Sequence, residues 1–399
     1  MTESFQAIAE AILSQAWRSP VRLENGERLD ERQHVQRWRV DEGPSSAPAT
    51  VIVKRARSSE ETPYDPDSSD TSSPAALLFN EWAALELLTQ TSAEVGPAFY
   101  GGDRMHGVLV LEDLGNGESL ADTLRGSDPA LAETQLIDYA TTLGRLHARS
   151  ASHISEYERL RSALGPWQPQ NSPCLELMQT GLEQTFAAIE IPLRPAAQAD
   201  VQTVLASLRD PGPFLALIHG DSCPDNDRFV AGSLRLFDFE SAALRHALLD
   251  GVYGRIHFPT CWCVRRLPAE LPLKMEQAYR AELVKGCPQA GDDRLFYRAT
   301  VEMCAAWLFT MCFWAGRDIR QFLDSDRDWG ISTIHQRILL RSEILLALTQ
   351  EFGHLQALGE AFDNLNARLR QRWDWQGEAM PLYPAFEKME SLQGGNDHV

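Results

Sequence analysis

Short stretches near the N-terminus alternate between apolar and polar residues, the pattern of a strand with one buried face. Residues 35–40 alternate in this way, residues 50–54 form a β-branched run that ends at Lys54, and residues 108–111 form another apolar run. Asn25-Gly26 lies between two further short runs, and this dipeptide is typical of a tight hairpin turn. The first part of the chain is therefore expected to be rich in strands.

Apolar residues at helical spacing predict a first helix that begins at Thr2-Glu3-Ser4 and ends before Pro20. The same spacing predicts helices over residues 75–89 and 132–148, and a largely helical chain over 151–208 and 259–375. The apolar run 304–316 is too short to span a bilayer and is bounded by charged residues, so we expect a buried core helix and no membrane segment.

Residues 108–115 form an apolar strand that ends in a turn, and beyond about residue 114 the strand patterns give way to helical ones. We expect an N-terminal domain of residues 1–114 and a C-terminal domain of residues 115–399. Residues 58–74 are acidic, poor in apolar side chains and interrupted by proline, which predicts a mobile insertion in the first domain.

Glu81 lies on the leucine stripe of the helix expected over residues 75–89, where a carboxylate is out of place. Burying an unpaired charge is costly, so Glu81 is expected to have a cationic partner. The alternative is a side chain that reaches solvent at the rim of the stripe, as most acidic residues do.

A loop with candidate chemistry follows the apolar run 214–218. It starts with His219-Gly220-Asp221 and ends at Asn226, after which the chain turns back at 231–233 and arrives at Asp238. A turn of three residues would place Asn226 opposite Asp238, with their Cβ atoms about 5 Å apart. An amide oxygen and a carboxylate brought together in this way suit Mg²⁺, and Asp221 is the candidate base.

This motif, His-Gly-Asp followed by Asn226 and by Asp238-Phe239-Glu240, resembles the catalytic core of the aminoglycoside phosphotransferase and choline kinase-like small-molecule kinases. The resemblance implies an α+β, protein kinase-like fold with two lobes: a small antiparallel sheet with one main helix, then a larger, mostly helical lobe. The segment 108–115 is similar to the one that links the two lobes in this family, so the resemblance places the boundary at about residue 114. It further implies a nucleotide-binding N-terminal lobe and a C-terminal lobe that carries catalysis and binds the acceptor.

The resemblance also assigns roles. Asp221 would accept the proton of an acceptor hydroxyl, while Asn226 and Asp238 would hold Mg²⁺ on the phosphates of ATP, with GTP as an alternative nucleotide. Lys54, at the end of its strand, would contact the phosphates and pair with Glu81. The expected activity is transfer of the γ-phosphoryl group to a small-molecule hydroxyl.

Other interpretations stay open. His-Gly-Asp is also a common loop sequence whose acidic and amide side chains bond locally, and Lys54 could be a solvated residue at a strand end. The turn region Asn25-Gly26 and the following residues 30–34 offer one glycine, whereas these kinases usually cover the phosphates with a glycine-rich or Ser/Asn-containing turn. A pseudokinase that binds nucleotide or regulates a partner without transfer is therefore the rival hypothesis.

Composition limits the kinds of partner that we expect the protein to bind. The formal net charge of -19 argues against nucleic-acid binding and leaves room for a cationic acceptor. The 7 cysteines are odd in number and lack paired metal-finger spacing, which favours reduced thiols. Together with the lack of a visible secretion signal, this predicts a cytoplasmic protein.

Overall fold

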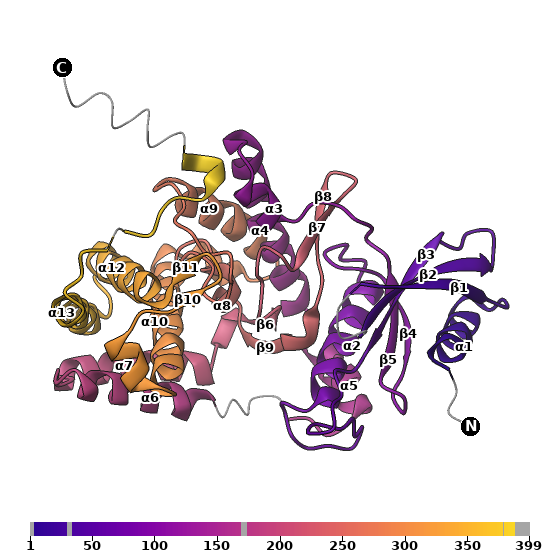
Figure 1. The fold of residues 1–399 in the computed structure, drawn as a ribbon, viewed down its shortest axis with the longest axis horizontal. Coiled ribbons are helices and arrows are strands. Elements are labelled where there is room, and N and C mark those ends of the chain that lie inside the picture. The colour runs from indigo at the N-terminus through magenta and orange to yellow at the C-terminus, as the bar shows by residue number, and fades with distance from the viewer. Residues whose placement is uncertain (1–3, 30–33, 169–173, 378, 388–399) are drawn as a thin grey trace.

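The computed structural model describes residues 4–29, 34–168, 174–377 and 379–387. The N-terminal part holds a five-stranded antiparallel sheet in the order β1-β2-β3-β5-β4 (Figure 1). The strands are β1 (Arg22–Arg28), β2 (Val35–Glu42), β3 (Thr50–Arg55), β4 (Phe99–Asp103) and β5 (Val108–Glu112). Helix α1 (Phe5–Trp17) packs on one face of this sheet, and helix α2 (Pro74–Gln90) packs on the other.

Side chains of β3 alternate between these two faces. Val51 and Val53 pack in the cluster that contains α1, whereas Ile52 packs against the core that contains α2. Residues two apart in a strand share a face, so Lys54 lies on the same face as Ile52. The strand therefore directs Lys54 toward the helix that carries Glu81.

The predicted tight turn at Asn25-Gly26 is wrong. Both residues lie inside β1, at a register irregularity against β2 between Glu24 and Glu27, and Asn25 has a φ of 53°. Asparagine tolerates this left-handed conformation, so the strand absorbs the irregularity and continues. The link from β1 to β2 passes through 30–33, which lie outside the described residues; the expected phosphate-covering loop falls there.

Strand β4 has no counterpart in the sequence prediction, because Gly101 and Gly102 interrupt its apolar pattern. The glycine at 102 has a packing role. A Cβ there would come within 2.4 Å of the Trp82 ring on α2. The absent side chain therefore lets the helix approach the sheet.

The segment 58–74 contains no strand, and only its last residue belongs to a helix, α2. It is nevertheless attached to its surroundings. The Tyr64 hydroxyl donates to the Arg104 carbonyl at 2.5 Å, Arg104 Nη2 donates to the Pro66 carbonyl at 3.0 Å, and Ser73 caps α2. The mobility of this segment stays a prediction.

The rest of the chain is mostly helical and extends away from the sheet (Figure 1). Its helices are α3 (Leu120–Arg125), α4 (Pro129–Ala151), α5 (Ile154–Leu164), α6 (Cys174–Ala188), α7 (Pro195–Arg209), α8 (Leu248–Gly251), α9 (Leu271–Leu283), α10 (Asp293–Gly316), α11 (Ile319–Asp324), α12 (Ile334–Phe352) and α13 (Gln356–Arg372). Short antiparallel pairs join β6 (Leu215–Ile218) to β9 (Ala243–His246), β7 (Asp227–Val230) to β8 (Ser233–Leu236), and β10 (Asp328–Trp329) to β11 (Ser332–Thr333).

Four short 3₁₀ turns complete the described elements: η1 (Gly212–Phe214), η2 (Phe239–Ser241), η3 (Pro288–Gly291) and η4 (Pro384–Phe386). The chain leaves β5 at Glu112 and enters α3 at Leu120, so the boundary expected at about residue 114 lies in this connection and stays a prediction.

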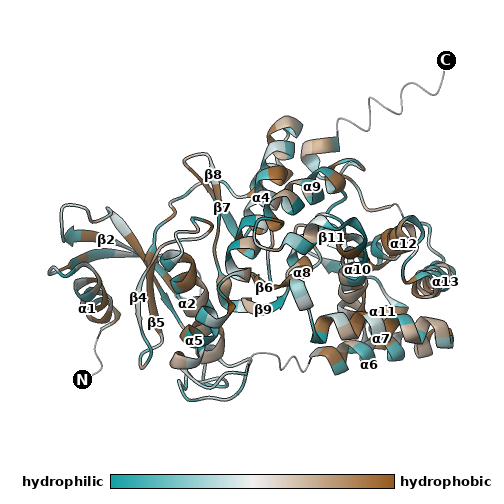
Figure 2. Cartoon of the chain, turned by 180° about the vertical axis from the view of Figure 1, so that it is seen from behind, coloured by the Kyte–Doolittle hydropathy of each residue, from teal (hydrophilic) through white to brown (hydrophobic). Residues whose placement is uncertain are grey.

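Helix α10 lies in the core, as predicted for the run 304–316. Among the described helices it alone is long and apolar enough to cross a membrane, and 67% of its most apolar window is buried inside the protein. Figure 2 shows brown, hydrophobic segments in the strands of the sheet where they meet α2.

Candidate active site

Lys54, Glu81 and Asp238 form a charge cluster between the sheet, α2 and the segment after β8, in which Lys54 and Glu81 are buried and Asp238 is half-buried. Lys54 Nζ lies 2.6 Å from Glu81 Oε2 and also contacts the Asp238 carboxylate. Burial alone would lower the pKa of Lys54, but the carboxylates of Glu81 and Asp238 outweigh it and raise that pKa. The predicted pairing of Lys54 with Glu81 is confirmed, and the solvent-exposed alternative for each residue is wrong.

Arg57 extends this cluster toward solvent. Arg57 Nη2 lies 3.5 Å from Asp238 Oδ2, and Arg57 Nη1 lies 3.2 Å from Glu240 Oε1. Burial opposes ionisation of Asp238, yet Lys54 and Arg57 hold its pKa below the usual value. Burial and the charge of Asp238 raise the pKa of Glu240. On this side of the site two cations, Lys54 and Arg57, therefore face three carboxylates, those of Glu81, Asp238 and Glu240.

The loop that carries Asp221 is positioned by the β6–β9 pair. Its first residue, His219, is buried, and its backbone N–H donates to Asp250 Oδ2 at 2.7 Å. The Gly220 N–H also donates to Asp250, at 3.3 Å. Gly220 has a φ of 80°, and a Cβ there would come within 2.4 Å of the Ser241 carbonyl oxygen. The tight turn before Asp221 therefore requires glycine.

The His219 ring links the loop to the end of β8. Its Nε2 lies 2.9 Å from the Phe237 carbonyl, and its Nδ1 accepts a 3.4 Å hydrogen bond from the Asp221 N–H. These partners assign the proton to Nε2. The ring also packs on Phe239, with centroids 4.6 Å apart. His219 thus holds the start of the loop against the chain that carries Asp238.

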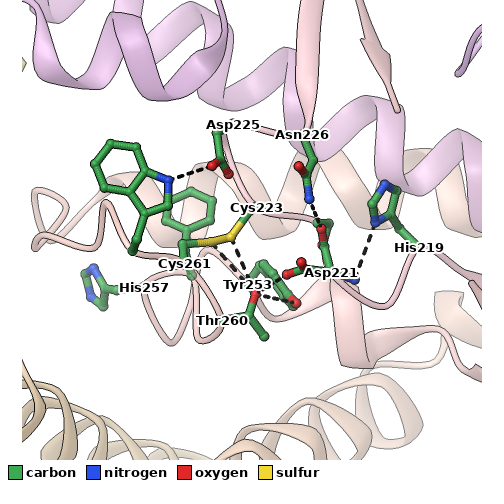
Figure 3. Close-up of a disulfide and its surroundings, with 12 residues drawn as sticks. His219, Asp221, Cys223, Asp225, Asn226, Tyr253, His257, Thr260 and Cys261 are labelled. Carbon is green, nitrogen blue, oxygen red and sulfur yellow. Dashed lines mark hydrogen bonds between the residues drawn. A yellow bond between two sulfur atoms is a disulfide. The ribbon is translucent and has the colours of Figure 1, made fainter. Parts of the chain in front are cut away.

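Asp221 accepts a hydrogen bond from a residue distant in sequence. Thr260 Oγ1 donates to Asp221 Oδ1 at 2.7 Å, and the Tyr253 hydroxyl lies 3.2 Å from Thr260 Oγ1 (Figure 3). Burial raises the pKa of Asp221, and the charges of Asp225 and Asp238 add to this effect, whereas the bond from Thr260 opposes it. The carboxylate is therefore a stronger proton acceptor than an ordinary surface aspartate.

The predicted register between Asn226 and Asp238 is wrong. The β7–β8 hairpin turns through Ala231-Gly232 alone, because Val230 pairs with Ser233, and the Phe237 N–H donates to the Asn226 carbonyl at 3.0 Å. A turn of two residues shifts the pairing by one position. Asp238 then leaves the ladder with a left-handed φ of 65°, in contact with Lys54.

Asn226 remains in the site. Its Nδ2 donates to the Asp221 carbonyl at 2.9 Å, which fixes the amide and leaves its oxygen as the atom available for a ligand (Figure 3). The donor set of Asn226 and Asp238, an amide oxygen and a carboxylate, has the chemistry that Mg²⁺ prefers. Clusters of three or more His, Cys, Asp or Glu side chains able to hold a metal do not occur among the described residues.

The expectation that all cysteines are reduced thiols is contradicted. Cys223, on the loop of Asp221, forms a disulfide with Cys261, 38 residues further along the chain (Figure 3). Proximity in the fold decides this pairing, and sequence spacing does not reveal it. The described side chains of Cys263, Cys287, Cys304 and Cys312 are free and buried. A cytoplasmic location stays a prediction.

Comparison with known proteins identifies the family of this chain. Residues 25–271 match the model of the phosphotransferase enzyme family, APH. The chain belongs to this family. The predicted fold class is thereby confirmed for this phosphotransferase: a kinase-like fold with a five-stranded antiparallel sheet and a helix, followed by a mostly helical part. Among curated proteins, none matches the sequence.

Several solved structures are similar to this phosphotransferase over most of its length. Choline kinase LicA from Streptococcus pneumoniae is 15% identical, with 85% of this chain and 99% of that chain covered and a TM-score of 0.41. A choline/ethanolamine kinase family protein from Mesorhizobium loti is 14% identical, with 90% and 100% covered and a TM-score of 0.42. Macrolide 2'-phosphotransferase MphH from Brachybacterium faecium is 16% identical, with 80% and 99% covered and a TM-score of 0.43.

Three residues of this phosphotransferase site were not expected from the sequence: Arg57, Asp250 and Thr260. Asp250 had a signal, since an acid inside the apolar run 247–252 needs buried donors just as Glu81 needs a cation. It is fully buried, accepts from the loop of Asp221 and lies 3.4 Å from His147 Nε2. Arg57 and Thr260 carry no such signal, because their partners come from distant segments.

Proposed function

We propose that the protein transfers the γ-phosphoryl group of ATP to a hydroxyl of a small molecule. The observation that supports this proposal is that the site contains two separate sets of groups. Lys54, buried and paired with Glu81, reaches Asp238 on one side, and Asp221 is held by Thr260 on the other. Phosphoryl transfer needs one set of groups for the phosphates and another for the acceptor, and it relies mostly on positioning and charge.

Asp221 is the proposed base. Its carboxylate would orient the acceptor hydroxyl and accept its proton, and the burial that raises its pKa strengthens it for this task. Lys54 would contact the nucleotide phosphates, with Glu81 fixing the position of its ammonium group. Arg57 lies beside Asp238 and Glu240 and is partly exposed, so its guanidinium group could also contact a phosphate.

Asn226 and Asp238 are the proposed ligands of Mg²⁺. The fixed amide of Asn226 and the ionised carboxylate of Asp238 fit this ion. When bound, Mg²⁺ would neutralise charge on the nucleotide phosphates. The carboxylates of Asp221, Asp238 and Glu240 and the net charge of -19 also support a cationic acceptor.

The test is ATP consumption with Mg²⁺ over a panel of hydroxyl acceptors, covering amino alcohols, aminoglycosides, other sugars and hydroxyl-bearing amino acids. Asp221→Asn should lower turnover by about 10²- to 10⁴-fold, because the amide keeps the shape and loses the proton acceptor. The dissociation constant of ATP should stay close to that of the wild type, since Asp221 acts on the other reactant.

Asp225→Asn is the matched control on the same loop. Asp225 Oδ2 accepts a 2.6 Å hydrogen bond from Trp262 Nε1, and an amide oxygen can still accept it. This variant should keep most of the turnover. Wild-type turnover in Asp221→Asn would show that Asp221 is not the base. Lack of Mg²⁺-dependent ATP use by the wild type with every acceptor would favour a binding or regulatory protein.

A further inference from the structure

The segment 253–263 lies against the loop of Asp221 and is held there from both sides. On one side the Cys223–Cys261 disulfide joins the two segments, and Asp225 accepts the bond from Trp262. Figure 3 shows this disulfide joining the loop of Asp221 to the chain that carries Thr260. The segment therefore has a covalent connection to the loop of the proposed base.

On the other side, two buried arginines of α12 hold the backbone of this segment. Arg341 Nε donates to the Ile256 carbonyl at 2.9 Å, and Arg337 Nη1 donates to the Cys261 carbonyl at 2.7 Å. His257 and Phe258 have φ values of 53° and 49°, a left-handed conformation that costs side-chain-bearing residues free energy. The surrounding contacts maintain this shape, so the position of Thr260 is defined by packing as well as by the disulfide.

Thr260 is the residue through which the segment reaches Asp221. A carboxylate only accepts hydrogen bonds, so the Thr260 hydroxyl donates to Asp221 and accepts from Tyr253. The side-chain torsion that rotates an aspartate carboxylate has a broad profile, and a single strong bond can select one orientation. Thr260 Oγ1 also lies 3.6 Å from Cys223 Sγ, directly beside the disulfide.

We propose that Thr260 is a positioning residue for Asp221 and that the Cys223–Cys261 disulfide keeps it in place, so that transfer depends on the thiol–disulfide state of the solution. This inference rests on the proposed role of Asp221. A dithiol supplies two electrons and two protons to the disulfide, yielding two cysteine thiols and the oxidised, cyclic form of the dithiol. Lys54, Glu81 and Asp238 lie on other elements, and Asn226, which is on the same loop, is held by the Asp221 carbonyl and not by Thr260. The dissociation constant of ATP should therefore change less than kcat.

The first test replaces the hydroxyl of Thr260. Thr260→Val keeps the shape and should lower kcat about tenfold or more, the effect of losing a hydrogen bond to a charged group. The dissociation constant of ATP and the melting temperature should be close to those of the wild type. Thr260→Ser retains the hydroxyl and should recover most of kcat. Thr300→Val, which removes another buried hydroxyl bonded within α10, is the matched control.

Wild-type kcat in Thr260→Val would overturn the positioning role, as would a Thr260→Ser variant as impaired as Thr260→Val. Asp221→Asn in the same assay separates the two hypotheses. If Asp221→Asn loses turnover and Thr260→Val does not, this inference fails while the proposed function stands. If Asp221→Asn keeps turnover, the proposed function itself fails.

The second test addresses the disulfide. A non-reducing digest of air-purified protein should yield a Cys223–Cys261 crosslinked peptide by mass spectrometry. Dithiothreitol should lower kcat of the wild type, and the fall should not exceed the one that Thr260→Val causes. In the Thr260→Val variant dithiothreitol should have no further effect on kcat, because two perturbations that act through the same contact are not additive. The Cys287→Ala control, which removes a free buried thiol, should respond like the wild type.

The disulfide half of the proposal is overturned by absence of the crosslinked peptide. It is also overturned by unchanged kcat after mass spectrometry confirms full reduction. A loss of ATP affinity that accompanies the fall in kcat would show that the disulfide supports the whole site and does not act through Thr260.

Discussion

Lys54 has a side chain that is 9% exposed and lies between Glu81, which is 2% exposed, and Asp238. Lys54→Met would leave the Glu81 carboxylate buried without its cation. Breaking a buried ion pair by removing one partner costs about 3–5 kcal/mol. The cost is limited because Glu81 can take up a proton. Keeping a carboxyl with an ordinary pKa of about 4.3 protonated at pH 7 costs about 3.7 kcal/mol, and this is the upper limit of the loss, because burial already raises the pKa of Glu81 in the wild type.

Glu81→Gln should be less harmful, because Lys54 keeps its contact with Asp238. Its expected cost is the loss of a charged hydrogen bond, about 1.5 kcal/mol. The double variant removes both buried charges and should be more stable than the sum of the single losses predicts, by about 2 kcal/mol, since contacting residues couple.

The assay is urea unfolding without nucleotide, followed by tryptophan fluorescence at pH 7 and pH 5. Burial already raises the pKa of Glu81 to about 7 in the wild type, against the opposing charge of Lys54. Lys54→Met removes that opposition and raises the pKa further. At pH 7 the folded variant therefore holds a proton that the unfolded chain has lost, and acid favours the folded state. Because burial already raises the pKa of Glu81 in the wild type, acid stabilises both proteins, and the loss relative to the wild type should shrink between pH 7 and pH 5.

The exposed pair Lys274 and Glu133, with nitrogen and oxygen 2.5 Å apart, serves as the control. Its Met and Gln variants should show no resolvable coupling, because solvent screens exposed pairs. Additive losses at Lys54 and Glu81, or a Lys54→Met loss that does not change between pH 7 and pH 5, would refute this account of the buried pair.

Two further outcomes are expected. Asp238→Ala should weaken binding of Mg-ATP by at least about tenfold, because the metal loses its charged ligand and Lys54 loses an acceptor; thermal-shift titration with and without Mg²⁺ measures this, and an unchanged Mg²⁺ response would remove Asp238 from the metal site. Burial lowers the pKa of His257 from 6.5 to about 3. Its contribution to stability is therefore fully present above pH 6.5, and it is lost as the pH falls from 6.5 toward 3, because the unfolded chain takes up the proton first. His257→Asn, which suits the left-handed backbone and can still accept from the Leu267 N–H, should therefore lose about 2 kcal/mol less than the wild type between pH 7 and pH 5, and equal acid sensitivity would exclude His257 as a cause.

Local patterns in the sequence determined which face of an element each residue occupies. Alternation along β3 sets Lys54 on the face opposite Val53, and helical spacing places Glu81 on the leucine stripe of α2. A charged residue on a buried face needs a partner, so the pairing of these two residues could be predicted. The short separation of Asp221 from Asn226 likewise placed both in one loop.

Tertiary structure alone decided how distant segments meet. The two-residue turn at Ala231-Gly232 shifted Asp238 by one position, because hairpin register depends on turn geometry that composition did not specify. Packing of α12 against the segment 253–263 positions two contacts. These are the hydrogen bond from Thr260 to Asp221 and the disulfide from Cys223 to Cys261. Such contacts arise from closing long loops over a common core, and no periodicity in the chain encodes them.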